Sequence, residues 1–246
     1  MIFNAFQFIF DIYLNFGMIK ENLQDIRNKI SEACQRSGRD VSEITLIAVS
    51  KTFSPEKIRE AHNAGILDIG ESYVQEMTGK FNELKNETIR WHFVGPLQRN
   101  KVKYIVDFVH LIHSVENLRV CQEIEKRASR IDRDIDILVE VNTSGEPQKH
   151  GISPDELPKL FDEIGVFDHV HVRGLMTMAP FVDDPEDARP SFKLLKDLRK
   201  RLLDDGLPEI QVQHLSMGMS NDFEVAIEEG ATMVRIGSSI FGERPH

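Results

Sequence analysis

Residues 44–51 read ITLIAVSK, a continuous apolar run that ends in Ser50 and Lys51. A short run of this kind, rich in β-branched residues, is typical of a strand that a parallel sheet buries on both faces. In the simplest interpretation, the lysine marks where the chain reaches solvent, because its aliphatic stem can pass apolar neighbours. A functional role for Lys51 needs support from the rest of the sequence.

Seven further runs of the same kind follow, at residues 67–72, 90–96, 111–115, 136–144, 170–179, 212–218 and 233–242. The segments between them carry apolar residues at helical spacing, as in FKLLKDLRKRLL at residues 192–203. Eight strands that alternate with helices in one chain of this length predict the α/β class and a (β/α)8 barrel of the TIM type. A doubly wound sheet is the alternative, but no glycine-rich dinucleotide fingerprint follows the first strand.

The N-terminal region divides into two parts. Residues 18–36 form an amphipathic pattern that predicts an extra helix, placed to fill the gap left after the eighth strand. Residues 1–17, MIFNAFQFIFDIYLNFG, are apolar but interrupted by polar residues, without the basic start of a signal peptide and too short for a membrane span. We interpret residues 1–17 as an extension or a mis-assigned start, and residues 18–246 as a single barrel domain.

Composition narrows the class of protein. The 246 residues are 41% hydrophobic and 28% charged, which is ordinary for a globular protein. The formal net charge of −10 argues against a nucleic-acid partner. Cys34 and Cys121 both fall in helical patterns without a metal-ligand neighbour, as expected of reduced packing residues in a cytoplasmic protein. The histidines form no grouping typical of a metal site. We therefore expect no bound metal ion and no association with a membrane.

The last two strand-end loops favour an anion. In a TIM-type barrel, the loops after the seventh and eighth strands commonly bind phosphate. Here they read SMGMSND at 216–222 and RIGSSIFG at 235–242, rich in glycine, in hydroxyls and in backbone N–H groups before a helix. Asp222 is interpreted as a helix cap. A strand-end lysine beside a phosphate cradle suggests an aldehyde that carries a phosphate, either pyridoxal 5′-phosphate (PLP) or a sugar phosphate.

Five motifs extend this picture: AVSKT (48–52), WHFVGPLQRNK (91–101), GLMTMAP (174–180), LSMGMSNDFEVAI (215–227) and ATMVRIGSSIFG (231–242). In content and order they resemble the pyridoxal phosphate homeostasis proteins (YggS/PROSC type), over about residues 20–243. The resemblance implies the barrel of the alanine racemase N-terminal domain without its second β domain.

The resemblance also implies a role for individual residues. Lys51 would hold PLP as a Schiff base, and Arg235 would face the pyridine nitrogen. The phosphate would be held by Ser216, Ser220, Gly237 and Ser238, and His92 and Met217 would line the ring pocket. Ser72 stands in GES where the family commonly has GEN, so a shorter hydroxyl replaces an amide near the cofactor.

Whether such a protein is an enzyme depends on its proton-transfer groups. A permanently charged arginine at the pyridine nitrogen weakens the ring as an electron sink, and the related racemases take a second base, a tyrosine, from the other domain. None of the three tyrosines, Tyr13, Tyr73 and Tyr104, sits at a strand end in the manner of a catalytic base, although Tyr73 directly follows the second strand. We therefore expect a non-catalytic protein that buffers or delivers PLP, with a stand-alone amino-acid racemase and a sugar-phosphate aldolase as alternatives. The expected partners are PLP and apo PLP-dependent enzymes, and the expected state is a monomer.

Overall fold

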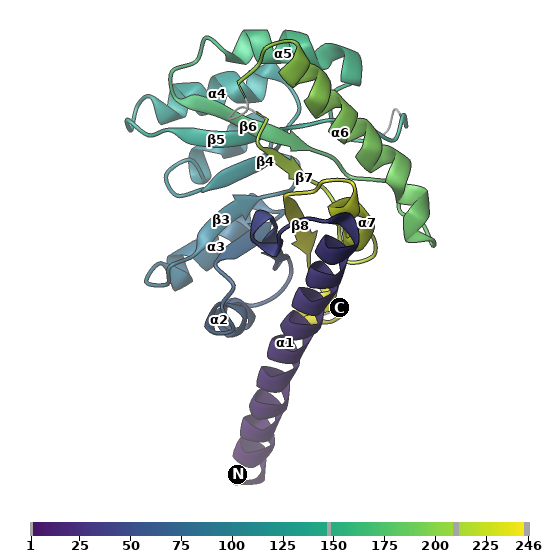
Figure 1. Ribbon diagram of the computed structural model, residues 1–246. Coiled ribbons are helices and arrows are strands. Elements are labelled where there is room, and N and C mark those ends of the chain that lie inside the picture. Colours follow the sequence, from purple (N-terminus) through teal and green to yellow (C-terminus); the bar gives the residue numbers. More distant parts are fainter. Residues whose placement is uncertain (1, 147–148, 209–211, 244–246) are drawn as a thin grey trace.

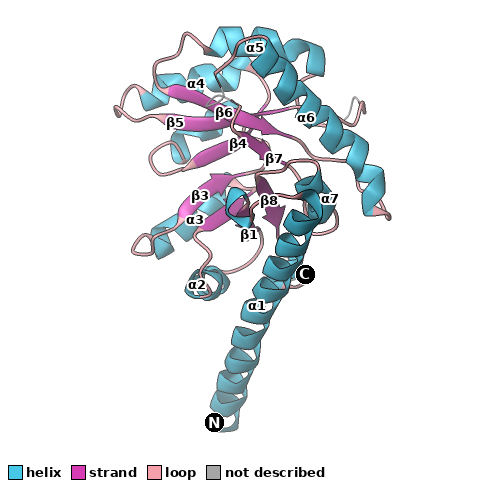
Figure 2. Cartoon of the chain, viewed as in Figure 1, coloured by secondary structure: helices cyan, strands magenta, loops and turns pink. Residues whose placement is uncertain are grey.

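The computed structural model describes residues 2–146, 149–208 and 212–243, with side chains from Met18 onward. Eight parallel strands close into a barrel in sequence order, and β8 pairs with β1 (Figures 1 and 2). The strands are β1 (Thr45–Val49), β2 (Asp68–Glu71), β3 (Arg90–Phe93), β4 (Leu111–Val115), β5 (Ile135–Glu140), β6 (Val170–Met176), β7 (His214–Ser216) and β8 (Met233–Ile236). Seven of them lie within the runs expected from the sequence, and β5 begins one residue before its run, so the predicted (β/α)8 barrel is confirmed.

Helices connect the strands and cover the outside of the barrel. They are α2 (Pro55–Asn63), α3 (Val74–Leu84), α4 (Leu118–Ala128), α5 (Leu157–Ile164), α6 (Arg189–Asp204), α7 (Phe223–Glu228) and α8 (Ser238–Phe241). Short 3₁₀ helices are η1 (Val41–Glu43), η2 (Arg99–Tyr104), η3 (Pro154–Glu156) and η4 (Pro185–Ala188). The segment at 97–109, expected as a helix, contains only the 3₁₀ helix η2. Its helical periodicity reflects burial of Val102, Ile105 and Val106 against the barrel, while the backbone makes tighter bonds such as Ile105 N to Val102 O.

The first helix, α1, runs without interruption from Ile2 to Ser37 and does not begin at Met18. Gly17 is tolerated inside it because a single glycine costs a helix only about 1 kcal/mol. The part from Met18 onward packs beside α7 and α8 (Figure 1), where Asn22 donates to the Ile240 carbonyl oxygen and Arg36 pairs with Glu224 and Glu228. This part of α1 therefore fills the place of an eighth barrel helix, as predicted, together with the single turn of α8. In the described ranges, no helix has the length and apolarity that a membrane crossing requires.

Strand alternation separates two environments. Side chains that point outward from the strands, such as Trp91, Phe93 and Val234, join the helices in the main hydrophobic core. Five inward-pointing apolar side chains form a second, small cluster inside the barrel: Ile47, Leu111, Leu138, Met176 and Met233. Other inward positions carry buried polar groups: Asp68, His92, His113, Glu140, Ser216 and Arg235. The barrel interior is therefore partly polar, and those polar groups need partners inside it.

Candidate functional site

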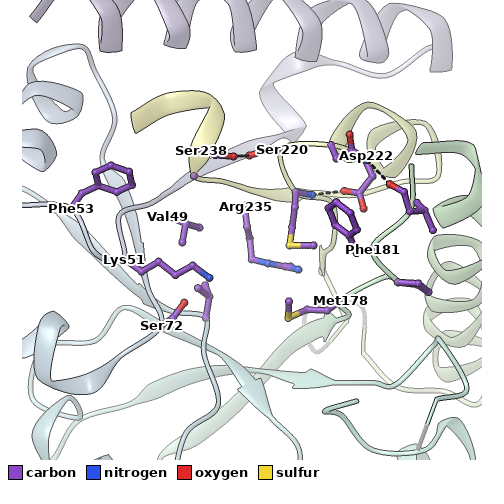
Figure 3. Close-up of a pocket in the computed structure, with 16 residues that line it drawn as sticks. Val49, Lys51, Phe53, Ser72, Met178, Phe181, Ser220, Asp222, Arg235 and Ser238 are labelled. Carbon is purple, nitrogen blue, oxygen red and sulfur yellow. Dashed lines mark hydrogen bonds between the residues drawn. The ribbon is translucent and has the colours of Figure 1, made fainter. Parts of the chain in front are cut away.

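A pocket of about 320 Å³ opens at the carboxyl ends of the strands. We call it the strand-end pocket, and its lining residues are Val49, Lys51, Phe53, Ser72, Val94, Met178, Pro180, Phe181, Val182, Met219, Ser220, Asn221, Asp222, Arg235, Gly237 and Ser238. Six of the nine residues expected at the site line it: Lys51, Ser72, Ser220, Arg235, Gly237 and Ser238. Figure 3 shows the Lys51 and Arg235 side chains extending into the same space, with Ser72 near Lys51 and the two serines along one edge.

The turn that carries Lys51 is held on both sides. The carbonyl oxygen of Ser50 accepts a 2.8 Å hydrogen bond from Lys80 Nζ, and the N–H of Thr52 donates over 2.8 Å to Glu76 Oε2. Thr52 has φ of +70°, a left-handed conformation that a β-branched residue adopts only when neighbouring contacts impose it. The same Lys80 ammonium binds both carboxylates, Glu76 at 3.0 Å and buried Glu71 at 2.7 Å. A charged cluster from β2 and α3 thus fixes the backbone on either side of Lys51.

Arg235 reaches the pocket from β8 and is only 5% exposed. Its Nη1 donates to Ser216 Oγ over 2.6 Å and its Nη2 to the Thr177 carbonyl oxygen over 2.9 Å. Burial lowers the pKa of the Arg235 guanidinium to about 10, with Glu140 and Asp222 opposing the shift. The side chain therefore remains a cation at neutral pH and can only donate hydrogen bonds to a ligand.

The two strand-end serines lie side by side. Ser238 Oγ donates to Ser220 Oγ over 3.2 Å, so the loops after β7 and β8 meet at this point (Figure 3). Gly237 allows the second loop to approach β1, since a Cβ there would lie 3.0 Å from the Val49 carbonyl oxygen. Ser238 begins α8, whose first N–H groups have no partner within the helix. Hydroxyls and backbone donors at one edge of the pocket suit an oxyanion.

Asp222 differs from its expected role as a helix cap. It occupies the residue before α7, but its carboxylate makes no capping bond and instead accepts the N–H of Met219 over 2.6 Å. The bond closes the loop 216–222 on itself, because Met219 and Asp222 bracket Ser220. Burial raises the pKa of Asp222, opposed by the Met219 N–H and by Arg235.

Apolar side chains form the mouth of the pocket. Phe53, two residues after Lys51, packs against Phe241 of α8 with ring centroids 5.1 Å apart. On the other side, Phe181 and Met178 are 88% and 45% exposed, and Phe181 lies near Asp222 in Figure 3. Asn221 Nδ2 donates to the Val182 carbonyl oxygen over 3.0 Å and joins this rim to the loop after β7. A flat aromatic ligand would find apolar walls here.

Three expected site residues lie outside the pocket lining. Ser216, Met217 and His92 are all buried, at 0%, 0% and 1% exposure. Ser216 Oγ is engaged by Arg235 and by His113 Nδ1 at 2.9 Å, so the structure gives it a contact with the arginine rather than with the pocket. His92 points into the barrel, where it contacts Asp68 and His113 at 2.9 Å each. The motifs include these positions, but Ser216 and His92 make their contacts inside the barrel, and Met217 packs in the main hydrophobic core.

Sequence reasoning also missed residues that the structure brings to the site. One feature of the sequence could have indicated the cluster of Lys80, Glu71 and Glu76. A glutamate lies within the apolar run 67–72, and a buried carboxylate needs a cation. His113 had a similar signal, a histidine within the apolar run 111–115. Across the described parts of the chain, no group of three His, Cys, Asp or Glu residues is placed to hold a metal ion.

Fold and site together define a class: a TIM-type barrel with a lysine after its first strand, an arginine on its eighth and an oxyanion edge between its last two loops. The family model described as "Alanine racemase, N-terminal domain" matches residues 19–245. The alanine racemase of Corynebacterium glutamicum shares the fold, with a TM-score of 0.72 at 12% identity, over 93% of this chain and 62% of that one.

Similarity to a narrower group is much greater. The pyridoxal phosphate homeostasis protein of Aquifex aeolicus is 46% identical over 226 residues, covering 92% of this chain and 98% of its own. PipY of Synechococcus elongatus, in a structure with PLP bound, has a TM-score of 0.80 at 31% identity, over 91% of this chain and all of that one. The chain belongs to the pyridoxal phosphate homeostasis family within the alanine racemase N-terminal-domain fold.

Proposed function

We propose that this chain binds PLP in the strand-end pocket, covalently through Lys51, and serves PLP homeostasis as a carrier or buffer. The observation that carries the proposal is that the Lys51 amine and the Arg235 guanidinium line one pocket, with paired serine hydroxyls at its edge. PLP presents an aldehyde, a ring nitrogen and a phosphate, and this pocket offers one partner for each. The PLP-bound structure of PipY supports the same assignment.

The residues fit the cofactor group by group. When bound, PLP supplies an aldehyde that links reversibly to an amine, and Lys51 supplies that amine. Ser220, Ser238 and the backbone around Gly237 would hold the phosphate. Arg235 would donate to the ring nitrogen, and Ser72 would contact the cofactor beside Lys51. Val49, Phe53 and Met178 provide apolar walls for the ring.

We propose that holding PLP, rather than turning over amino acids, is the role of this site. Arg235 is a cation that donates hydrogen bonds, so it disfavours a protonated ring nitrogen and the electron-sink chemistry that depends on it. Racemisation also needs a second base opposite the lysine. Among the described lining residues none is a tyrosine, and Tyr73 and Tyr104 are 55% and 47% exposed elsewhere. The curated relatives are likewise named for homeostasis.

The test is the absorption spectrum of the protein with added PLP, before and after borohydride, followed by peptide mass spectrometry. We expect a yellow protein whose reduced cofactor is retained on the peptide that contains Lys51, and no retention in Lys51→Ala. Lys159→Ala is the matched control, because the Lys159 side chain is 78% exposed. A wild-type protein that stays colourless with PLP would overturn the proposal. Racemisation of an amino acid, detected by chiral chromatography, would favour the alternative of a stand-alone amino-acid racemase.

A carrier must also release its cofactor. We expect transfer of PLP from the loaded protein to an apo PLP-dependent enzyme, measured as recovered activity of that enzyme in dilute solution. If PLP reaches the apoenzyme no faster than it is released spontaneously, the result contradicts a delivery role. Buffering of PLP would then remain as the proposed role. We further propose a cytoplasmic location, supported by Cys34 and Cys121 as buried free thiols and tested by cell fractionation. We also propose a monomer, which light scattering tests.

A further inference from the structure

A row of hydrogen-bonded side chains crosses the barrel interior from β2 to β8. Asp68 Oδ1 lies 2.9 Å from His92 Nε2, and His92 Nδ1 lies 2.9 Å from His113 Nε2. His113 Nδ1 lies 2.9 Å from Ser216 Oγ, and that oxygen lies 2.6 Å from Arg235 Nη1. Five strands contribute one side chain each, and all five side chains are buried. The row joins the pocket to the amino-terminal end of the barrel, where Arg90 pairs with Asp68.

The Asp68 end sets the direction of donation. Burial raises the pKa of Asp68, but hydrogen bonds from His92 and Arg90 outweigh burial and lower this pKa to about 2. The Asp68 carboxylate is therefore ionised and can only accept hydrogen bonds. His92 must therefore carry a proton on Nε2. Burial lowers the pKa of His92, so the ring is neutral and its Nδ1 accepts from His113 Nε2–H. Burial also holds the pKa of His113 well below its ordinary value, which leaves His113 Nδ1 as an acceptor.

The Arg235 end is compatible with the same direction. A guanidinium has no acceptor, so Ser216 Oγ must accept from Arg235 Nη1. The serine hydroxyl then has its own hydrogen to donate to His113 Nδ1. Every link runs from Arg235 towards Asp68, and the two ends agree without an unpaired donor or a clash of two acceptors.

We infer that His92, His113 and Ser216 are positioning residues for Arg235, acting as one oriented hydrogen-bond chain anchored on the Asp68–Arg90 ion pair. The Thr177 carbonyl oxygen holds Nη2 from the other side, so the guanidinium plane is fixed at two nitrogen atoms. A chain of this kind has one proton arrangement, and it aims the arginine at the pocket without placing a second charge beside it. The consequence for PLP rests on the proposed function, because Arg235 would meet the ring nitrogen there.

The first experiment needs no cofactor. ¹⁵N-histidine NMR of the full chain reports which ring nitrogen carries the proton, with the two residues identified by His92→Gln and His113→Gln. We expect both rings to be neutral and protonated on Nε2 at pH 7 to 8. In Ser216→Ala, the Nδ1 signal of His113 should move to that of an acceptor without a donor, whereas buried Ser191→Ala on α6 should leave it unchanged. A proton on Nδ1 of either ring in the wild type would overturn the chain.

The second experiment uses PLP. We expect Ser216→Ala to weaken PLP binding about tenfold and to shift the visible band, because the ring-nitrogen partner is less well fixed. Ser216→Thr, which keeps the hydroxyl, should restore both. Unchanged affinity and spectrum in Ser216→Ala, with PLP still retained on Lys51, would overturn the positioning role. Failure of the wild type to bind PLP would instead overturn the proposed function. The NMR experiment alone would then test the hydrogen-bond chain.

Discussion

Lys80 Nζ donates a 2.8 Å hydrogen bond to the carbonyl oxygen of Ser50, the residue before Lys51. Lys80 comes from α3, and its ammonium is also shared by Glu71 on β2, whose carboxylate accepts the Ser50 hydroxyl. The proposed PLP-linking lysine is therefore held by a second, buried lysine that itself never reaches the pocket lining.

Lys80→Met should destabilise the protein and weaken PLP binding. The change leaves Glu71, which is 0% exposed, without its cation, and breaking a buried pair in this way costs about 3–5 kcal/mol. Release of the Ser50 carbonyl also frees the turn that carries Lys51. Denaturant unfolding and PLP titration measure the two effects. Lys159→Met is the exposed control. A Lys80→Met protein as stable as that control would contradict the role of Lys80 in holding the turn that carries Lys51.

Gly95→Ala should lower both stability and PLP affinity. A Cβ at Gly95 would lie 2.2 Å from the carbonyl oxygen of Ser72, so the backbone beside the pocket must shift, at a cost of about 2 kcal/mol. Gly79→Ala is the matched control, because nothing lies within 4 Å of a Cβ there and Gly79 is inside α3. The control should gain up to about 1 kcal/mol. Thermal unfolding of the two variants should therefore move in opposite directions.

Glu140→Gln should stabilise the protein at alkaline pH. Burial, with help from Glu116 and against Arg235, raises the pKa of Glu140 to about 7 from an ordinary 4.5. Between these values the unfolded chain loses the proton while the folded protein keeps it, so wild-type stability falls as pH rises, by on the order of 3 kcal/mol in total. Glutamine removes that loss.

The measurement for Glu140 is the difference in unfolding free energy between Glu140→Gln and wild type. We expect it to be largest at pH 8 and to shrink towards pH 4.5. Glu83→Gln, at an exposed position of α3, should show no such dependence. A difference for Glu140→Gln that does not change with pH would mean that the carboxyl is ionised in the folded protein throughout.

Ser238→Ala should discriminate between ligands. If Ser238 holds the phosphate, its loss removes a hydrogen bond to a charged group and weakens PLP binding about tenfold. Pyridoxal, which lacks the phosphate, should bind wild type and variant equally. Ser239→Ala is the neighbouring control, because Ser239 does not line the pocket. Equal loss of PLP and pyridoxal affinity in Ser238→Ala would place the phosphate elsewhere.

The sequence by itself determined the barrel and the identity of the site-forming strand ends. Eight short apolar runs alternating with amphipathic helices have few ways to bury both faces of a sheet. The strands β1 to β8 could therefore be predicted, with Lys51 just after β1 and Arg235 on the neighbouring strand β8. The loops after β7 and β8 could be predicted to meet because parallel strands end at one edge. Local patterns carry this information, since burial and turn chemistry act over a few residues.

Only the tertiary structure decided where each side chain points and which distant residue it contacts. Ser216 and Ser220 share one motif, yet one contacts Arg235 inside the barrel and the other lines the pocket. Lys80 reaches Ser50 across 30 residues, and His113 reaches Ser216 across 103. The physical reason is that buried polar groups must find hydrogen-bond partners, and barrel closure and register determine which partners lie within about 3 Å.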